Sequence, residues 1–353
     1  MKINFLHITF FVAIIIFGFS FSNKKFSDPN KEKLLIEVVK YVVEKGHYNS
    51  IEIDDGISEK IFNSYIEQLD NQKRFFLQSD IRQFEKYKFK LDDQLKDHNL
   101  TFFDLVFQIS RERIDEVKDY YYDIMEKGFD FSSDENIDLD FENKSFARSK
   151  NEIKNRWRKQ LKYSTLDILT LKLGDSIKII ENKTLDESMS LIKKNTEDFF
   201  DYVSEMDRDD WFANYINAFL NQLDPHTVYF NPDDKDRFDT NISGKFNGIG
   251  ARLQKTEGAV KIVDIIVGGP IWKDKLLDVG DIILKVAQEN EDPVDIIGMK
   301  LDDAIKLIKG PADSVVKLTV KKIDGEIKDV SIKRGLVELE ELYAKSTLIS
   351  KDN

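Results

Sequence analysis

The stretch Gly248-Ile249-Gly250-Ala251-Arg252-Leu253 decides how the second half of this chain is interpreted. Its two glycines permit positive φ angles, so several consecutive backbone N–H groups can converge on one anion. The residues that follow, 252–255, predict a short strand, and the edge of a strand beside such a turn can accept an extended peptide. Taken alone, a G-x-G pattern is more often a tight turn without a ligand, beside leucine and isoleucine that only pack.

Around this stretch, residues 242–334 have the texture of a small α+β module. Runs rich in β-branched and aliphatic residues predict strands at 262–267, 282–286 and 315–320. Asp324-Gly325 follows the last of these runs and predicts a hairpin turn. Two short helices are expected near 271–276 and over 301–309, the second ending at Gly310-Pro311.

The preceding residues, 23–241, are predicted to form a mainly helical domain. Apolar residues recur there at helical spacing, in stripes that begin at Leu34, Ile61, Ile81 and Phe102 and in helices around 185–203 and 211–223. The third stripe runs from Ile81 to Leu95. The predicted fold class is therefore α+β: a large, mainly α-helical N-terminal domain followed by a small β-barrel or sandwich with two short helices.

The module at 242–334 resembles a PDZ domain, with Gly248-Ile249-Gly250-Ala251 in the place of its carboxylate-binding loop. The resemblance implies that the backbone amides of Gly248, Ile249, Gly250 and Ala251 receive the terminal carboxylate of a peptide. It also implies a groove between the strand and the second helix, and Leu253, Leu301 and Ile305 are the candidates for its wall. Arg252 or Lys255 is expected to assist at longer range.

Motifs outside this module extend the resemblance over nearly all of the chain after its first segment. They are Gly46-His47-Tyr48, Leu69-Asp70, Phe75–Ile81, Leu223-Asp224-Pro225-His226-Thr227, Val279-Gly280-Asp281, Ile308-Lys309-Gly310-Pro311 and Leu339-Glu340. Together they resemble bacterial tail-specific proteases, the C-terminal processing peptidase family. Two departures are Asn71, where proline is expected, and Val228, where serine is expected.

The family resemblance implies a periplasmic serine endopeptidase that recognises apolar C-termini and cuts with a serine–lysine dyad. In that family the catalytic core lies C-terminal to the PDZ domain, so we expect no catalytic residue in this chain. Residues 335–353 are interpreted as the start of a linker into a missing protease domain, because 336–349 leads onward without a closing element. The alternative is a complete, non-catalytic PDZ adaptor or chaperone-like protein that binds peptides.

For each of the other candidate sites, a structural role explains the residues better than a catalytic or ligand-binding role. Two S-x-x-K matches, Ser190–Lys193 and Ser314–Lys317, lie on a predicted solvated helix face and on opposite faces of a predicted strand. His226 more often marks an Asp-Pro turn than a catalytic base. The four histidines lack metal-ligand spacing, and Leu253 replaces the third glycine of a dinucleotide loop. We therefore expect neither a metal nor a cofactor.

The first segment predicts export. Lys2, an apolar run of about 12 residues and the small residues up to Ser22 are typical of a signal peptide at 1–22, with an uncleaved anchor or a cytosolic core helix as alternatives. No later segment approaches membrane-spanning length. Absence of cysteine excludes disulfides, thiolate metal sites and cysteine nucleophiles, but it does not fix the compartment. The expected location is the periplasm.

Charge argues against nucleic acid as a partner. The chain carries a net charge of −12, while residues 242–334 hold 16 basic and 15 acidic residues, so the remainder carries −12 − 1 = −13. Residues 144–162 hold eight lysines or arginines against Glu152 alone. We interpret this stretch as a solvated helix or a dock for a protein, and an adaptor on the helical domain is a possible partner.

Overall fold

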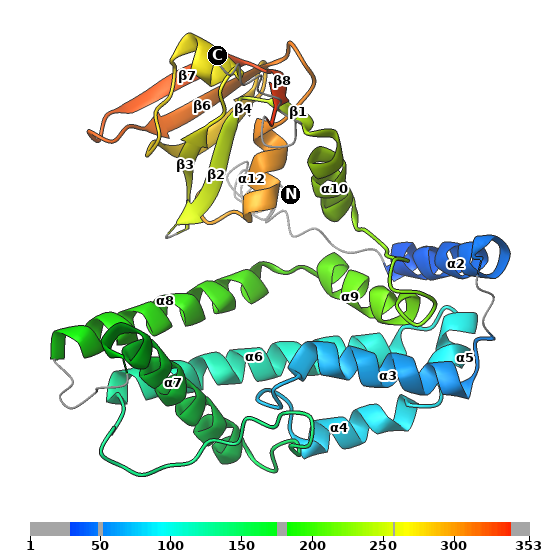
Figure 1. The fold of residues 1–353 in the computed structure, drawn as a ribbon. Coiled ribbons are helices and arrows are strands. Elements are labelled where there is room, and N and C mark those ends of the chain that lie inside the picture. Colours follow the sequence, from blue (N-terminus) through cyan, green and yellow to red (C-terminus); the bar gives the residue numbers. More distant parts are fainter. Residues whose placement is uncertain (1–28, 49–51, 175–181, 257, 340–353) are drawn as a thin grey trace, which may run out of the picture. The chain divides into compact units, whose positions relative to one another are not determined.

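The computed structural model describes residues 29–48, 52–174, 182–256 and 258–339. The chain divides into two compact units, Met1–Tyr229 and Phe230–Asn353 (Figure 1). The sequence placed the domain boundary after residue 241, whereas helix α10 (Pro232–Ser243) belongs to the second unit. The predicted signal segment 1–22 and residues 340–353 lie outside the described residues.

The first unit consists of helices. Their bounds are α2 (Pro29–Gly46), α3 (Asp55–Asp70), α4 (Gln78–Phe84), the 3₁₀ turn η1 (Glu85–Tyr87), α5 (Leu91–Lys96), α6 (Thr101–Lys127), α7 (Lys150–Leu173), α8 (Asn182–Glu205) and α9 (Arg208–Leu220). The periodic stripes predicted most of these elements. Glycine ends two of the long helices: Gly128 after α6 and Gly174 after α7 both have positive φ.

Two apolar clusters hold this unit together, and α6 contributes to both. Its first half places Phe102, Phe103 and Val106 in a cluster with α3, α5 and α9. Its second half places Val117 and Tyr121 in a cluster with α7 and α8 (Figure 1). A helix of 27 residues is about 40 Å long, so one continuous element can serve both clusters.

The prediction of one helix from Ile81 to Leu95 was wrong, because the chain breaks between α4 and α5. Ser58 on α3 explains the break: its hydroxyl donates to the carbonyl of Lys88 at 2.9 Å and accepts from the amide of Leu91 at 2.7 Å. These tertiary hydrogen bonds satisfy backbone groups that a continuous helix would pair internally.

The second unit contains α10 and a small antiparallel β structure. The strands are β1 (Lys245–Gly248), β2 (Ala251–Thr256), β3 (Ala259–Ile265), β4 (Ile282–Gln288), β5 (Val294–Asp295), β6 (Val315–Lys321), β7 (Ile327–Lys333) and β8 (Gly335–Glu338), with the short helices α11 (Pro270–Asp274) and α12 (Leu301–Ile308). The main sheet has the order β2-β3-β4-β6-β7, with β5 beside β4, while β1 pairs with β8. The predicted α+β fold class is confirmed.

The core of the second unit explains its strand register. Alternate residues of β6 point inward, so Val316, Leu318 and Val320 are fully buried between the sheet and the helices. The predicted hairpin at Asp324-Gly325 joins β6 to β7, and Gly325 has φ 92°. Within the described ranges, no helix has both the length and the apolarity needed to cross a membrane.

Candidate peptide-binding site

The conformation of the loop between β1 and β2 requires glycine at position 250. This glycine has φ 84°, and a Cβ on it would lie 3.0 Å from the Cα of Gly269. A side chain is therefore excluded both by backbone conformation and by close approach of a second segment. The carbonyls of Ile249 and Gly250 accept from the amides of Ile271 and Ile266, at 3.1 and 2.9 Å, which ties the loop to α11 and to the residue after β3.

The N–H groups of the same two residues are unused. Neither the Ile249 nor the Gly250 amide donates a hydrogen bond to any residue that the structure describes. Both residues are buried, with Ile249 only 3% exposed. Because backbone donors in folded proteins are nearly always paired, two adjacent amides without an internal acceptor are available to an acceptor from outside the chain.

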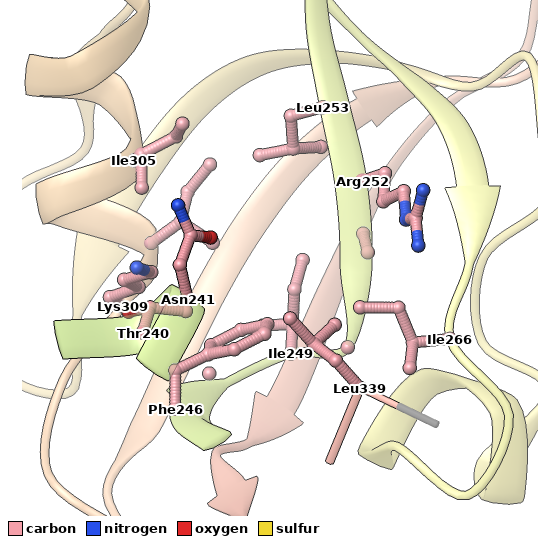
Figure 2. A pocket seen from close by; sticks show the side chains of 14 residues that line it. Thr240, Asn241, Phe246, Ile249, Arg252, Leu253, Ile266, Ile305, Lys309 and Leu339 are labelled. Carbon is pink, nitrogen blue, oxygen red and sulfur yellow. The ribbon is translucent and has the colours of Figure 1, made fainter. Parts of the chain in front are cut away.

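A pocket of about 520 Å³ opens at this loop, between β2 and α12 (Figure 2). Its volume lies within the range of pockets that bind small ligands. The wall is mostly apolar and is formed by Phe246, Ile249, Leu253, Ile266, Ile305 and Ile308. Strand β2 is at one end of the main sheet, so its outer edge faces this space without a neighbouring strand of that sheet.

The structure brings together all but one of the residues predicted for this site. Gly248, Ile249, Gly250, Ala251, Leu253 and Ile305 line the pocket. Leu301 does not: it is the first residue of α12, where it packs against the core of the unit. Four residues of helix separate it from Ile305 by about 6 Å along the axis. Helical periodicity placed Leu301 on the correct face but could not indicate which turn meets the pocket.

Sequence reasoning missed Phe246, Ile308, Lys309 and Leu339, which also line the pocket. Phe246 lies two residues before the glycine loop, and a Cβ on Gly248 would approach its ring to 3.1 Å. Ile308 and Lys309 end the helix whose apolar face the sequence did identify. Leu339 follows β8, and the pairing of β8 with β1 could not be seen from local pattern.

A lysine supplies positive charge to the pocket. The Nζ atom of Lys309 lies 4.9 Å from the centre of the Phe246 ring, and burial lowers the pKa of this lysine from its usual value. Arg252 also lines the pocket, with its Nε 3.6 Å from a carboxylate oxygen of Asp264. Lys255 is not a lining residue; its Nζ lies 3.5 Å from the carbonyl of Gly298.

The buried guanidinium of Arg334 fixes the end of α12. It donates to the carbonyls of Ile308 and Leu307, at 2.8 and 3.0 Å, and therefore satisfies two terminal carbonyls of the helix. It also donates to Gln288 Oε1 at 2.7 Å and Ser314 Oγ at 3.0 Å. These contacts hold the C-terminal turn of α12, and with it Ile308 and Lys309, against the sheet.

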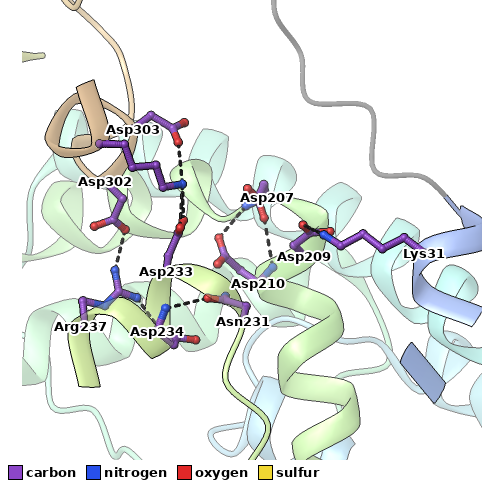
Figure 3. Close-up of polar contacts among 11 residues, drawn as sticks. Lys31, Asp207, Asp209, Asp210, Asn231, Asp233, Asp234, Arg237, Asp302 and Asp303 are labelled. Carbon is purple, nitrogen blue, oxygen red and sulfur yellow. Dashed lines mark hydrogen bonds and ion pairs between the residues drawn. The ribbon is translucent and has the colours of Figure 1, made fainter. Parts of the chain in front are cut away.

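Charged pairs connect α12 to α10 (Figure 3). Helix α10 also contributes Thr240 and Asn241 to the lining of the pocket. Arg237 Nη1 lies 2.7 Å from Asp302, and Lys306 Nζ lies 2.7 Å from Asp233. Asn231 caps the start of α10 by accepting from the amide of Asp234. The cations are exposed and the partner carboxylates are partly buried, so each pair contributes about 1 kcal/mol.

The two S-x-x-K sequences have other roles. Ser314 donates to the carbonyl of Pro311 at 2.6 Å and accepts from Arg334, while Lys317 pairs with Asp329 at 3.1 Å. Lys193 lies 3.9 Å from Glu197 on the same helix. None of the described residues forms a group of three or more His, Asp or Glu able to hold a metal ion.

His226 belongs to the turn that the sequence indicated. The carboxylate of Asp224 accepts from the Thr227 hydroxyl at 2.6 Å and from the His226 amide at 2.9 Å. His47, which follows α2, contacts Thr227 Oγ1 at 3.0 Å and lies 3.5 Å from Asp224. The separate motifs Gly46-His47-Tyr48 and Asp224–Thr227 therefore form one hydrogen-bonded cluster within the first unit.

Comparison with known proteins gives the family. The profile described as "Tail specific protease N-terminal domain" matches residues 38–233, more than half of the chain. The chain belongs to this family. A PDZ domain profile matches residues 240–321, which include the glycine loop, β2 and α12.

Curated relatives of the family agree. The chain is 30% identical over 305 residues to the tail-specific protease of Haemophilus influenzae, covering 86% of this chain and 42% of that protein. It is 30% identical over 190 residues to the carboxy-terminal processing protease CtpA of Bacillus subtilis, covering 52% of this chain and 39% of that protein. The chain thus spans less than half the length of these two relatives.

Among solved structures, the PDZ domain of a carboxy-terminal protease from Vibrio cholerae, in complex with a peptide, is 43% identical. It covers 27% of this chain and 99% of that one, with a TM-score of 0.26.

Proposed function

We propose that the second unit binds the free, apolar C-termini of protein substrates and delivers them for proteolysis. The observation that carries this proposal is the pair of unpartnered amides, Ile249 and Gly250, at the end of an apolar pocket. Membership of the tail-specific protease family and the PDZ match support the same function. In this proposal the chain is the substrate-recognition part of a tail-specific serine endopeptidase.

The binding mode follows from the geometry of the site. An extended peptide adds to the open edge of β2, and its terminal carboxylate accepts hydrogen bonds from the amides of the glycine loop. The last side chain enters the pocket between Leu253 and Ile305, above Ile308. Lys309 lies beside the pocket and favours the anionic terminus by Coulomb attraction, which a half-buried setting strengthens.

Cleavage itself is proposed to lie in sequence that this chain does not contain. The family's serine–lysine dyad is expected after the PDZ domain, and this chain spans 42% of the length of its Haemophilus relative. Ser314, the S-x-x-K serine just before β6, has a structural role beside Arg334, which supports this division of labour. The location is proposed to be the periplasm, on the pattern of residues 1–22.

Peptide binding tests the proposal. A fluorescent decapeptide ending in Val-Ala with a free carboxylate is titrated into the whole chain and followed by anisotropy. Its C-terminal amide is the matched ligand. We expect the amide to bind at least about tenfold more weakly, because the loop amides would lose a charged acceptor.

Variants of Lys309 locate the site. Lys309→Glu is expected to lower the affinity for the free-acid peptide by about tenfold or more, because it places a negative charge beside the carboxylate. Lys321→Glu, an exposed position on β6 outside the pocket, is the control and should change affinity less than twofold. Substitution of Ile249 is a poor test because its side chain is buried in the core. Equal affinity for acid and amide, or equal effects of the two lysine variants, would refute the groove assignment.

A further inference from the structure

A second pocket, of about 300 Å³, lies within the first unit between helix α7 and the loop that precedes it. It is separate from the groove of the second unit and involves none of its residues. Four cationic side chains line it: Arg74, Lys144, Arg156 and Lys159. Against them stand only Asp138 and Glu152, so the lining carries a formal charge of +2 in a chain whose net charge is −12.

Three of these four cations form no ion pair with a carboxylate among the described residues, although the buried Asp70 attracts Arg74 electrostatically. Lys144 donates to the backbone carbonyl of Asp138 at 2.8 Å, and Lys159 donates to that of Asn136 at 2.7 Å. Arg156 alone pairs with an acid, Glu152, at 2.6 Å. Burial and the neighbouring cations Arg156 and Lys159 lower the pKa of Lys144 from its usual value, which reflects crowding of like charge around the pocket.

The remaining basic residues of α7 behave differently. Lys150 pairs with Glu116, Lys154 with Asp123, and both Arg158 and Lys162 with Glu135. Each of these cations therefore contacts a carboxylate, although Arg158 and Lys162 share one. Lys144 and Lys159 of the pocket differ, because their hydrogen bonds within the described residues go to backbone carbonyls, which leave their charge uncompensated.

Arg74 is the central donor of this pocket. Its guanidinium carbon lies 4.4 Å from the centre of the Trp157 ring and 5.6 Å from that of Phe75. Across the described part of the chain, its side chain donates to no acceptor. The guanidinium is thus in contact with aromatic rings while its N–H groups lack an internal acceptor and are available to a ligand, and burial lowers the pKa of this group.

The backbone around Arg74 is fixed in advance. The buried carboxylate of Asp70 accepts from the amides of Arg74, Phe75 and Phe76, at distances of 2.8 to 2.9 Å. Trp157 donates its indole N–H to the carbonyl of Arg74 at 2.8 Å. Asp70 therefore fixes the backbone of a segment whose Arg74 N–H groups have no hydrogen-bond acceptor among the described residues, and the same carboxylate attracts the guanidinium through space. Free N–H groups on a fixed backbone suit an external acceptor.

A buried amide in the same pocket also lacks a partner. The Oε1 atom of Gln72 is inaccessible to solvent and has no hydrogen-bond partner among the described residues. The two ends of a glutamine amide are interchangeable by rotation, so the group can present either its oxygen or its NH₂ to the pocket. A bound ligand would remove the unpaired group.

We propose that this pocket is a carboxylate-binding site, which takes a dicarboxylate ligand or the acidic side chains of a peptide. The planar edge of Arg74 matches the two oxygens of a carboxylate, and Lys144 and Lys159 supply positive charge for a second one. The pocket is at the small end of the range for ligand sites, which fits a few-carbon diacid or one or two side chains.

Calorimetric titration of the whole chain tests this site. Three ligands are compared: glutarate, neutral glutaramide, and tetraglutamate acetylated and amidated at its ends so that it has no terminal carboxylate for the groove. Binding of glutarate alone identifies a free diacid as the ligand, and tighter binding of the peptide identifies an acidic protein segment. Either result supports the site, provided that glutaramide does not bind.

Substitutions assign the binding to this pocket. Arg74→Met and Lys159→Gln are each expected to lower the affinity for the tighter-binding ligand at least tenfold. Lys150→Gln, on the same helix as Lys159 but paired outside the pocket, should change that affinity less than twofold. Lys159→Gln keeps the test valid if Arg74→Met disturbs packing on Trp157. The proposal is refuted if neither glutarate nor the tetraglutamate peptide binds at millimolar concentration, or if phosphate binds more tightly than both. It is also refuted if Lys150→Gln lowers the affinity as much as Lys159→Gln does.

Discussion

At the scale of single residues, Gly310 and Arg334 explain why the end of α12 reads Ile308-Lys309-Gly310-Pro311. A Cβ on Gly310 would lie 2.9 Å from both Nε and Cζ of Arg334. The guanidinium cannot move aside, because carbonyls of α12 and the side chains of Gln288 and Ser314 hold it. Glycine is thus needed here for space and not for a left-handed conformation.

Substitutions at these two residues should therefore be coupled. Arg334→Met is expected to destabilise the second unit by about 3 kcal/mol, since buried carbonyls lose their donor. Gly310→Ala should cost about 1–3 kcal/mol through overpacking. The double variant should cost clearly less than the sum, because the added methyl group no longer meets a guanidinium. Urea unfolding measures all three.

Lys333→Met, at the exposed last position of β7 beside Arg334, is the control and should change the free energy of unfolding by less than about 1 kcal/mol. Additive costs for Gly310→Ala and Arg334→Met would show that the two residues do not oppose each other. Peptide affinity should fall with Arg334→Met as well, because Ile308 and Lys309 depend on this cap.

At the scale of elements, the sequence predicted periodicity well and tertiary pairing poorly. The strands at 259–265, 282–288 and 315–321 and most long helices appear where the apolar pattern placed them. The glycine loop and most of its pocket were also predicted, because glycine spacing is a local property. Leu301, Phe246 and Leu339 show the limit: their places depend on which turn of a helix and which distant strand meet the loop.

For helix α2, the apolar pattern did not predict which side chains are buried. Its predicted apolar stripe included Leu34, Val38 and Val42, yet these side chains are 59%, 50% and 57% exposed. The apolar residues that α2 buries are Ile36 and Val43. Periodicity identifies an apolar face but does not say how much of it another element covers.

The cluster that joins the end of α2 to the turn after α9 gives the first unit a pH dependence. Hydrogen bonds from the Thr227 hydroxyl and the His226 amide hold the pKa of Asp224 well below its usual range. A lowered carboxyl pKa contributes stability that is complete above the unfolded pKa, near 4, and is lost as pH falls through the folded pKa.

Asp224→Asn should therefore unfold at a lower temperature than the parent chain at pH 7. The difference should persist down to about pH 5 and shrink as the pH falls below about 4, where Asp224 of the unfolded chain begins to take up a proton while the folded carboxylate stays ionised. Far-ultraviolet circular dichroism of the helical signal measures this midpoint. Asp115→Asn, an exposed carboxylate on α6, is the control, and a gap that widens on acidification would contradict the assignment.

At the scale of the whole molecule, net charge is divided unevenly between residues 242–334 and the rest of the chain. The groove belongs to a nearly neutral module, while the remainder of the chain carries the acidity. The sequence predicted this division and the α+β architecture from composition and resemblance. It did not predict the cationic pocket of the first unit, because Arg74 and Lys159 are distant in sequence and meet only through packing of α7.

The whole chain should bind an unfolded substrate with an apolar C-terminus without cutting it. Incubation of purified protein with such a substrate, followed by electrophoresis and mass spectrometry over several hours, should show complex formation and intact substrate. Cleavage that persists in a Ser314→Ala variant, after repeated purification, would show that an active site resides elsewhere in this chain. Loss of cleavage in that variant would instead assign the activity to the S-x-x-K sequence.

The pairing of β1 with β8 has a consequence for the order in which the groove is assembled as the polypeptide emerges in synthesis or export. Gly248, at the entrance of the loop, is opposite Gly335, and the cap of α12 comes from Arg334. Strand β2 follows the loop directly and α12 comes about 50 residues later, but β8 and Arg334 arrive more than about 80 residues after the loop. In the proposed binding mode, a nascent chain that ends before β8 therefore exposes a groove without this support, and peptide binding waits until the last strand closes the module.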